Sequence, residues 1–366
     1  MYILIYGLRR NDQRGGRARA SAGRLMAQTF TRRWIVLGAL AAPLAAPAQG
    51  NAQGSGAAWP PLIIKIVVPY PPAGSTDVIA RLVQNGLQQR LGASVIIENR
   101  AGASGSIGTA AVAKSPPDGS NWLLVFDNHA ANPFVLPSLG YDTEKDLDPV
   151  LLIGTAPYWI ATSKAKPFQN LKDVIEAAKR SPGTISYASV GSGSVGHLAM
   201  TLLAQRAGVK LVHVPYRGGG PAMTDALGGH VDLLVGSTAL SMPQVNTGNL
   251  RALAQTGKTR NQFLTQVPTV IESGFPDFEA YAWWGIFAPA GTPKPIIEKF
   301  GTALADTLGE ERISKQLVET QQVTLLLGGP GAEREFLDQG WPDGHSGRTP
   351  GQGVGRHSDR NRRRTL

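Results

Sequence analysis

The segment Leu62–Val68, with the sequence LIIKIVV, and the loop and helix that follow it are the strongest indication of the fold class of this chain. A nearly unbroken β-branched run of this kind is typical of a strand that is buried on both faces. The loop Pro69–Asp77, PYPPAGSTD, leads into a predicted helix over 75–91, in which apolar residues recur at helical spacing. The alternation continues with a strand over 94–98, a helix over 105–113 and a strand over 121–126. These spacings predict βαβ units and a parallel sheet.

The alternation of strands and helices repeats after residue 170. Helices are predicted over 173–180, 195–207, 221–227, 295–308 and 312–320, and strands over 184–188, 211–214, 231–235, 250–254, 282–288 and 323–327. Two such parallel sheets predict an α/β protein with two lobes. Ligands of open parallel sheets bind outside the carboxyl ends of the strands, so functional residues are expected in the loops that follow the strands.

The charge of the chain is concentrated at its two ends. The formal net charge of the 366 residues is +10, of which residues 1–58 carry +7 and residues 340–366 carry +4, so that residues 59–339 carry −1. A duplex-binding domain needs a basic face that displaces counterions from phosphates, and the nearly neutral central part offers none. Nucleic acid is therefore not an expected partner. The chain has no cysteine, which excludes disulfides, thiolate metal sites and a cysteine nucleophile.

The first 58 residues contain a predicted signal peptide for export to the periplasm. Thr31–Trp34, TRRW, starts a basic-then-apolar pattern, and the apolar run Trp34–Ala48 ends in Ala-Pro-Ala, a small-x-small cleavage pattern. The run has about 15 residues, fewer than the roughly 20 that span a bilayer. A start at Met26 gives this signal an ordinary length, and the sequence leaves both the Sec and the twin-arginine route open. Residues 340–366, rich in Gly and Arg, are interpreted as a disordered or frameshifted tail.

The loop Pro69–Asp77, here called the first loop, is a candidate anion site. Gly74 allows the backbone to approach a ligand, and Ser75 or Thr76 can cap the helix that follows. The first amides of a helix carry a partial positive charge, which favours an anion. Asp77 falls in the first turn, where an acid also compensates the helix dipole.

Two further loops have the same character. The second loop, Ser189–His197 (SVGSGSVGH), leads into a helix, and its hydroxyls and amides can hold a second anionic group, or Ser194 can simply cap the helix. The third loop, Pro215–Pro221 (PYRGGGP), ends at a proline suited to a first helical turn. Its Arg217 either pairs with a carboxylate or lies solvated at the rim.

Catalytic motifs are weak in this sequence. Gly191, Gly193 and Gly196 spell G-x-G-x-x-G, but no acid follows at the expected distance; Arg217 could meet a 2′-phosphate, so an NADP-dependent oxidoreductase stays as an alternative. No G-x-S-x-G elbow or P-loop occurs, and we expect no enzyme activity, cofactor or metal. The four central histidines, His129, His197, His213 and His230, lack metal-ligand spacing and are interpreted as packing residues. Tyr281, Trp283 and Trp284 are interpreted as packing residues of the core or between the lobes, with a wall of the ligand cleft as the alternative.

Several stretches resemble a known family when taken in chain order. They are Pro69–Asp77, Glu98–Gly108 (ENRAGASGSIG), Pro117–Gly119, Asn132–Pro133, Tyr187–Ser189 with His197–Leu198, His213–Gly218 (HVPYRG), Gly229–Asp232, Leu250–Ala254, Val267–Val270 and Phe287–Pro293 (FAPAGTP). Across about residues 60–338 the sequence is similar to the solute-binding proteins of tripartite tricarboxylate transporters, the Bug family.

This resemblance implies a fold and a function. The fold is a two-lobed periplasmic-binding-protein fold, the type II-like Venus flytrap, with lobes at 59–156 plus 281–339 and at 157–280. The chain would cross between the lobes near Ala156 and Tyr281. The implied function is the capture of a small carboxylate by a monomeric protein and its delivery, unchanged, to membrane transporter subunits. A sensory binding protein for a receptor kinase is an alternative.

The resemblance also implies which residues hold the ligand. They are Ala73, Gly74, Ser75 and Asp77 in one lobe, Ser189, Gly193, Ser194 and His197 in the other, and Tyr216 nearby. Asp127, directly after the strand at 121–126, departs from the small hydroxyl residue that is common in the family at this place. A carboxylate here would disfavour a second anionic group and favour an amine or amide.

Overall fold

The computed structural model describes residues 59–262 and 264–329. The predicted signal peptide, the start at Met26 and the tail from residue 340 lie outside the described residues.

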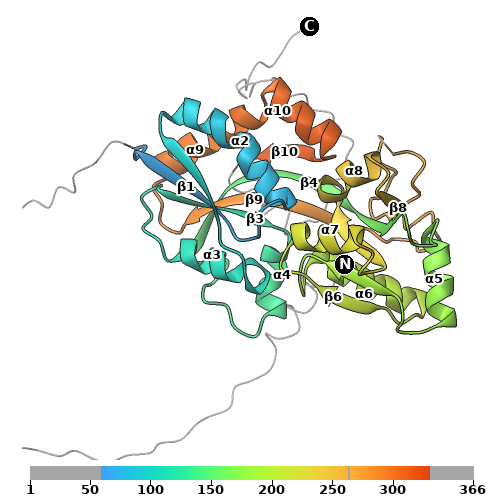
Figure 1. The fold of residues 1–366 in the computed structure, drawn as a ribbon. Helices are drawn as coiled ribbons and strands as arrows, with labels where there is room; N and C mark the ends of the chain where they lie inside the picture. The colour runs from blue at the N-terminus through green and yellow to red at the C-terminus, as the bar shows by residue number, and fades with distance from the viewer. Residues whose placement is uncertain (1–58, 263, 330–366) are drawn as a thin grey trace, which may run out of the picture.

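Ten strands and nine α-helices with two short helical turns make up these ranges (Figure 1). The strands are β1 (Ile63–Val68), β2 (Ser94–Asn99), β3 (Asn121–Phe126), β4 (Leu147–Ser163), β5 (Ser186–Ser189), β6 (Val212–Pro215), β7 (Leu233–Ser237), β8 (Leu250–Gln255), β9 (Tyr281–Pro289) and β10 (Thr324–Gly328). The helices are α2 (Ser75–Leu91), α3 (Ser106–Ala113), α4 (Asn128–Val135), α5 (Leu171–Arg180), α6 (Val195–Ala207), α7 (Gly219–Leu227), α8 (Thr238–Asn246), α9 (Lys294–Leu308) and α10 (Glu311–Lys315). A 3₁₀ turn lies at Ala103–Gly105 and a π-helical turn at Gln316–Thr320.

The strands form a mixed sheet with a parallel core at each end. The strand order is β2-β1-β3-β9-β4-β7-β5-β6, and β8 and β10 also pair with β4. The pairs of β1 with β2 and β3, and of β5 with β6 and β7, are parallel. Strands β9 and β4 join these two cores through antiparallel pairs. The α/β class is confirmed, whereas the expectation of purely parallel sheets is wrong.

Strand β4 is the longest strand of the described chain and passes through both halves of the sheet. It pairs with β9 from Leu147 opposite Pro289 to Pro157 opposite Tyr281, and from Tyr158 onward it pairs with β7. This exchange of partners occurs where the sequence predicts the crossing between lobes. The lobe boundaries themselves stay a prediction.

Strand β3 is buried on both faces, whereas the start of β1, predicted to be buried in the same way, has Ile63 exposed. Trp122, Leu124 and Phe126 belong to the core that contains α2 and α9, whereas Leu123 and Val125 belong to a second core with α3. This division follows from the alternation of side chains along a strand. None of the helices in 59–262 and 264–329 is long and apolar enough to cross a membrane.

Three elements, β4, α4 and α8, are not predicted from the sequence because they contain prolines or glycine. Strand β4 was not predicted because Pro149, Gly154 and Pro157 interrupt its apolar pattern, and its pairing with β9 shifts register near the first two. Helices α4 and α8 were not predicted because each carries an internal proline, Pro133 and Pro243. The remaining elements lie within a few residues of their predicted positions.

Candidate functional site

Helix α2 begins directly after the first loop, on a glycine. Its N-cap residue is Gly74, and no side chain of the described residues caps it. The prediction that Ser75 or Thr76 caps this helix is wrong, because both residues already lie in its first turn. The first N–H groups of α2 therefore have no side-chain cap, an arrangement that suits an anionic ligand.

Asp77 fixes the shape of the first loop. Its carboxylate accepts hydrogen bonds from the backbone N–H of Ala73 at 3.0 Å, from Arg81 Nε at 2.9 Å and from Asn99 Nδ2 at 2.9 Å. Burial by itself raises the pKa of Asp77, but these hydrogen bonds, above all that from Arg81, lower it below its usual value. Ala73 has a φ of +64°, a strained value for a residue with a Cβ, and its bond to Asp77 holds it there.

The first and third loops touch through their backbones. A Cβ on Gly220 would lie only 2.9 Å from the carbonyl oxygen of Pro72, and a Cβ on Gly74 would lie 3.8 Å from the backbone nitrogen of Gly219. The start of α7 therefore faces the start of α2. These loops follow β1 and β6, which lie in opposite halves of the sheet.

The second loop also meets residues from the first half of the sheet. Ser104 Oγ donates a hydrogen bond to the carbonyl oxygen of Ser192 at 3.0 Å. A Cβ on Gly193 would come within 2.3 Å of the side chain of Val135, which belongs to α4. The three predicted loops thus meet between the two halves of the sheet, at a place here called the crevice.

The side chains of the second loop already have partners within the loop. Ser194 caps α6, because its Oγ accepts from the backbone N–H of His197 at 3.3 Å and donates to the carbonyl oxygen of Gly191 at 2.8 Å. The N–H of Gly193 donates to His197 Nδ1 at 3.1 Å. Of the two roles predicted for Ser194, the side chain therefore has the capping role in this structure.

Buried Ser189 and two half-buried histidines form a polar cluster at this loop. Ser189 Oγ lies 2.7 Å from His213 Nε2, and the rings of His213 and His197 stack with centroids 3.9 Å apart. Burial and the neighbouring His197 lower the pKa of His213 to about 4, so its ring is neutral at pH 7. Because Ser189 is fully buried, this serine–histidine contact is packing and is not an exposed nucleophile.

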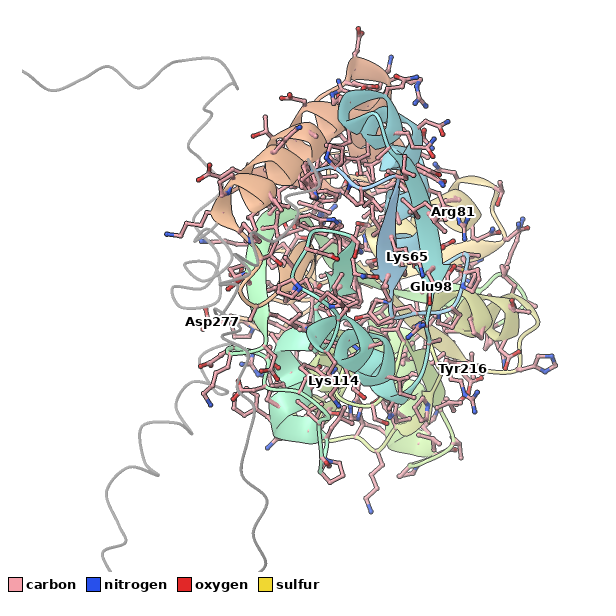
Figure 2. The ribbon with its side chains drawn as sticks, turned by 90° about the vertical axis from the view of Figure 1, so that its left-hand side faces the viewer. Lys65, Arg81, Glu98, Lys114, Tyr216 and Asp277 are labelled. Atoms are coloured by element: carbon pink, nitrogen blue, oxygen red, sulfur yellow. The ribbon has the colours of Figure 1, made fainter. Side chains whose placement is uncertain are left out.

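Tyr216 lies in the third loop, directly after β6, and is half-buried (Figure 2). Its hydroxyl donates to Asp225 Oδ2 at 2.6 Å, and burial followed by this carboxylate raises its pKa to about 12. The neighbouring Arg217 is exposed, in keeping with a solvated rim residue.

Asp127 is the most unusual group in the crevice, and it was not among the predicted ligand residues. It directly follows β3, is 1% exposed, and accepts a hydrogen bond at Oδ2 from the hydroxyl of Tyr158 at 2.5 Å. Its Oδ1 has no hydrogen-bond partner among the described residues, although the backbone amides of Val195 and Asn128 favour its charged form. Burial nevertheless raises the pKa of Asp127 to about 7.

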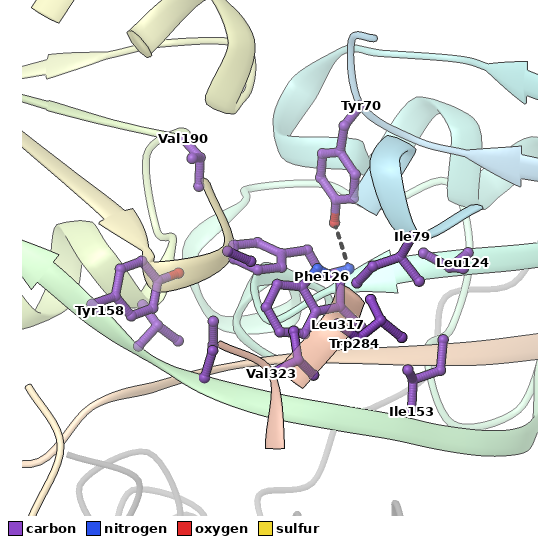
Figure 3. Close-up of a cluster of buried hydrophobic side chains, with 14 of the residues drawn as sticks. Tyr70, Ile79, Leu124, Phe126, Ile153, Tyr158, Val190, Trp284, Leu317 and Val323 are labelled. Carbon is purple, nitrogen blue, oxygen red and sulfur yellow. Dashed lines mark hydrogen bonds between the residues drawn. The ribbon is translucent and has the colours of Figure 1, made fainter. Parts of the chain in front are cut away.

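Aromatic side chains pack in a row from Tyr70 of the first loop through Phe126 to Tyr158, the hydrogen-bond partner of Asp127. The hydroxyl of Tyr70 accepts the backbone N–H of Phe126 at 3.1 Å, and the Phe126 ring lies 5.4 Å from that of Trp284 and 6.3 Å from that of Tyr158 (Figure 3). Trp283 and Trp284 are buried, which confirms their interpretation as packing residues.

The chain is similar to known proteins in both sequence and structure. A family model described as the tripartite tricarboxylate transporter family receptor matches residues 79–324. Protein BugT of Bordetella pertussis is 37% identical over 284 residues, which are 76% of this chain and 86% of BugT. An R. palustris protein solved with adipate is 33% identical, with a TM-score of 0.74 and coverage of 77% of this chain and 94% of that one. MatC from Rhodopseudomonas palustris, solved with bound malate, is 30% identical, with a TM-score of 0.67 and coverage of 71% and 88%.

Proposed function

Because this chain belongs to the tripartite tricarboxylate transporter receptor family, we propose that it captures a small carboxylate-bearing metabolite in the periplasm and delivers it, unchanged, to the membrane subunits of a transporter. The family is one of receptors. Relatives solved with adipate and with malate support carboxylates as the ligand class.

One observation carries this proposal: the starts of α2, α6 and α7 converge on a single crevice. Each of these helices follows a strand of a parallel core, so each presents its positive end at the carboxyl edge of the sheet. Such helix starts bind anions through backbone N–H groups. The ligand would be held mainly by the backbone at Ala73, Gly74 and Ser75 and by the start of α6 near Gly193 and Ser194.

The side chains of the other predicted residues would support these contacts. Asp77 would position the first loop through Ala73, and Ser189 would brace the second loop through His213. His197 would release the N–H of Gly193 by a change of rotamer, because this N–H now donates to its ring. Tyr216 would close the rim of the crevice.

Capture would use a hinge motion of two lobes, 59–156 plus 281–339 and 157–280. The paired strands β4 and β9 would connect the lobes at Pro157 and Tyr281. Opening would break the hydrogen bonds that cross the crevice, among them those from Ser104 to Ser192 and from Tyr158 to Asp127.

The competing NADP-dependent oxidoreductase is disfavoured by the same geometry. A dinucleotide on Gly191, Gly193 and Gly196 would place its pyrophosphate at the start of α6. The backbone amide of Val195 at this helix start already favours the charged form of Asp127, which would repel a pyrophosphate, and Val135 packs against Gly193. A shift of intrinsic fluorescence on addition of NADPH would revive this alternative.

Calorimetry on the full chain tests the proposed function. The chain, unfolded and refolded to remove co-purified ligand, is titrated with mono-, di- and tricarboxylates and amino acids. We expect a binder in the micromolar range, about −8 kcal/mol. Silence across the panel in folded protein would contradict the proposal.

A pair of glycine variants assigns the binding to the crevice. Gly193→Ala should weaken binding at least tenfold, because its Cβ meets Val135 in the closed form. Gly183→Ala is the matched control, since its φ of +76° is close to the +78° of Gly193 and its Cβ would meet no atom within 4 Å.

A further inference from the structure

A buried carboxylate reaches across the crevice to the start of α6. Asp127 leaves the end of β3 in one half of the sheet, and its Oδ2 accepts the hydroxyl proton of Tyr158, which lies on the part of β4 that pairs with β7 in the other half. Asp127 is 1% exposed, so its carboxylate is shielded from bulk water.

The start of α6 is directed at this carboxylate and its partner. The backbone amide of Val195, the first residue of the helix, favours the charged form of Asp127, and the amide of Gly196 does the same for the hydroxyl of Tyr158. The helix has 13 residues, and its side-chain cap, Ser194, binds the N–H of His197. Asp127 Oδ1 nevertheless remains without a hydrogen-bond partner among the described residues.

The other groups around Asp127 do not neutralise it. Tyr70 from the first loop and Tyr158 from β4 are neutral, because burial raises both pKa values well above the usual value. His129, two residues on in α4, is neutral because burial lowers its pKa to about 4. No Lys or Arg among residues 59–262 and 264–329 forms an ion pair with Asp127 in this structure.

On the basis of the proposed function, we infer that Asp127 supplies its own carboxylate to the anion subsite at the start of α6 and thereby sets ligand selectivity. A ligand carboxylate placed beside it would meet a like charge in a water-poor site, or would require Asp127 to take up a proton. An amide or amine on the ligand would instead donate to the free Oδ1. The favoured ligand class is therefore a monocarboxylate with a hydrogen-bond donor at its other end.

Matched ligand pairs test this inference. Succinate, glutarate and adipate are each compared by calorimetry with their own monoamide, at about pH 8, where the raised pKa leaves most Asp127 charged. We expect wild type to prefer the monoamide of the best-fitting length at least tenfold. Asp127→Asn, which keeps the shape, and Asp127→Ser, which opens space, should each reduce this preference at least tenfold.

Asp277→Asn is the matched control for charge. Asp277 is exposed, has a φ of +56° that asparagine tolerates, and lies on the opposite side of the molecule from Tyr216 (Figure 2). This variant should leave the monoamide-to-dicarboxylate ratio unchanged.

Each outcome decides one claim. A wild-type preference for dicarboxylates, or a ratio that neither Asp127 variant changes, would overturn the selectivity role while leaving the proposed function intact. If one Asp127 variant does not fold, the other variant and the pH dependence of wild-type selectivity give the same answer, because dicarboxylate affinity should fall as pH rises through about 7. Binding of neither member of any pair would overturn the inference and count against the proposed function.

Discussion

Gly220 of α7 lies directly against the carbonyl oxygen of Pro72: a Cβ at position 220 would be only 2.9 Å from this oxygen. This contact joins the first and third loops across the crevice. An oxygen of the backbone cannot move aside as a flexible side chain can. Any residue larger than glycine at position 220 should therefore keep the two loops apart.

We expect Gly220→Ala to weaken ligand binding at least tenfold without loss of stability. The substitution removes a glycine from the first turn of α7, which by itself stabilises a helix by up to about 1 kcal/mol. Calorimetry gives the affinity and urea unfolding gives the stability. Gly301→Ala in α9 is the control, because its Cβ would only make ordinary contact with Val150 at 3.4 Å. Equal affinities for the two variants would show that closure does not depend on this contact.

Asp77→Asn should loosen the first loop. It removes the charge from hydrogen bonds donated by Ala73 and Arg81, and we expect a loss of about 1–3 kcal/mol in unfolding free energy at pH 7. The pKa of Asp77 is lowered in the folded state, so its contribution is present above the unfolded pKa and disappears as pH falls through the folded value. Urea unfolding from neutral to acidic pH checks this; a loss that does not shrink toward low pH contradicts it.

The contribution of Asp127 to the unfolding free energy should depend on pH in the opposite direction to that of Asp77. Its pKa is raised to about 7 in the folded state, so the folded chain holds a proton that the unfolded chain releases near pH 4, at about the usual aspartate value. Relative to Asp127→Asn, wild type should therefore lose roughly 2–4 kcal/mol of unfolding free energy as pH rises from about 4 to above 7. The comparison with the variant cancels the opposite contributions of His129 and His213, whose pKa values are lowered. A constant difference across this range would mean that folding does not raise the pKa of Asp127.

Much of the fold follows from local sequence. Helices α2 and α6 and strand β3 lie where the spacing of apolar residues predicts them, although the cap predicted for α2 is wrong. Strand β4 could not be found in this way, since its prolines and glycine are accommodated only by irregular pairing with β9. Its role as the connection between the two halves of the sheet depends on pairing with β9 and β7, which lie far away in the sequence.

The sequence predicts which loops form the candidate site, but it does not predict the contacts between their residues. Strand ends and glycines locate Gly74, Gly193 and Gly220 near a ligand edge before any coordinates are known. That Asp127 reaches Tyr158 depends on how two elements meet when the crevice closes. Sequence spacing carries no signal for such a pairing; only the position of an acid at the end of a buried strand hints at it.

Cross-linking across the crevice tests most directly whether it closes on a small carboxylate. The chain has no cysteine, so Ser104→Cys and Ser192→Cys provide one thiol on each side, at positions where Ser104 Oγ now lies 3.0 Å from the carbonyl oxygen of Ser192. The rate of cross-linking by a short bismaleimide is measured with and without adipate, malate and their monoamides. We predict that a carboxylate that binds in calorimetry accelerates cross-linking severalfold, and that Gly220→Ala abolishes the acceleration. An unchanged rate at saturating ligand would contradict the account.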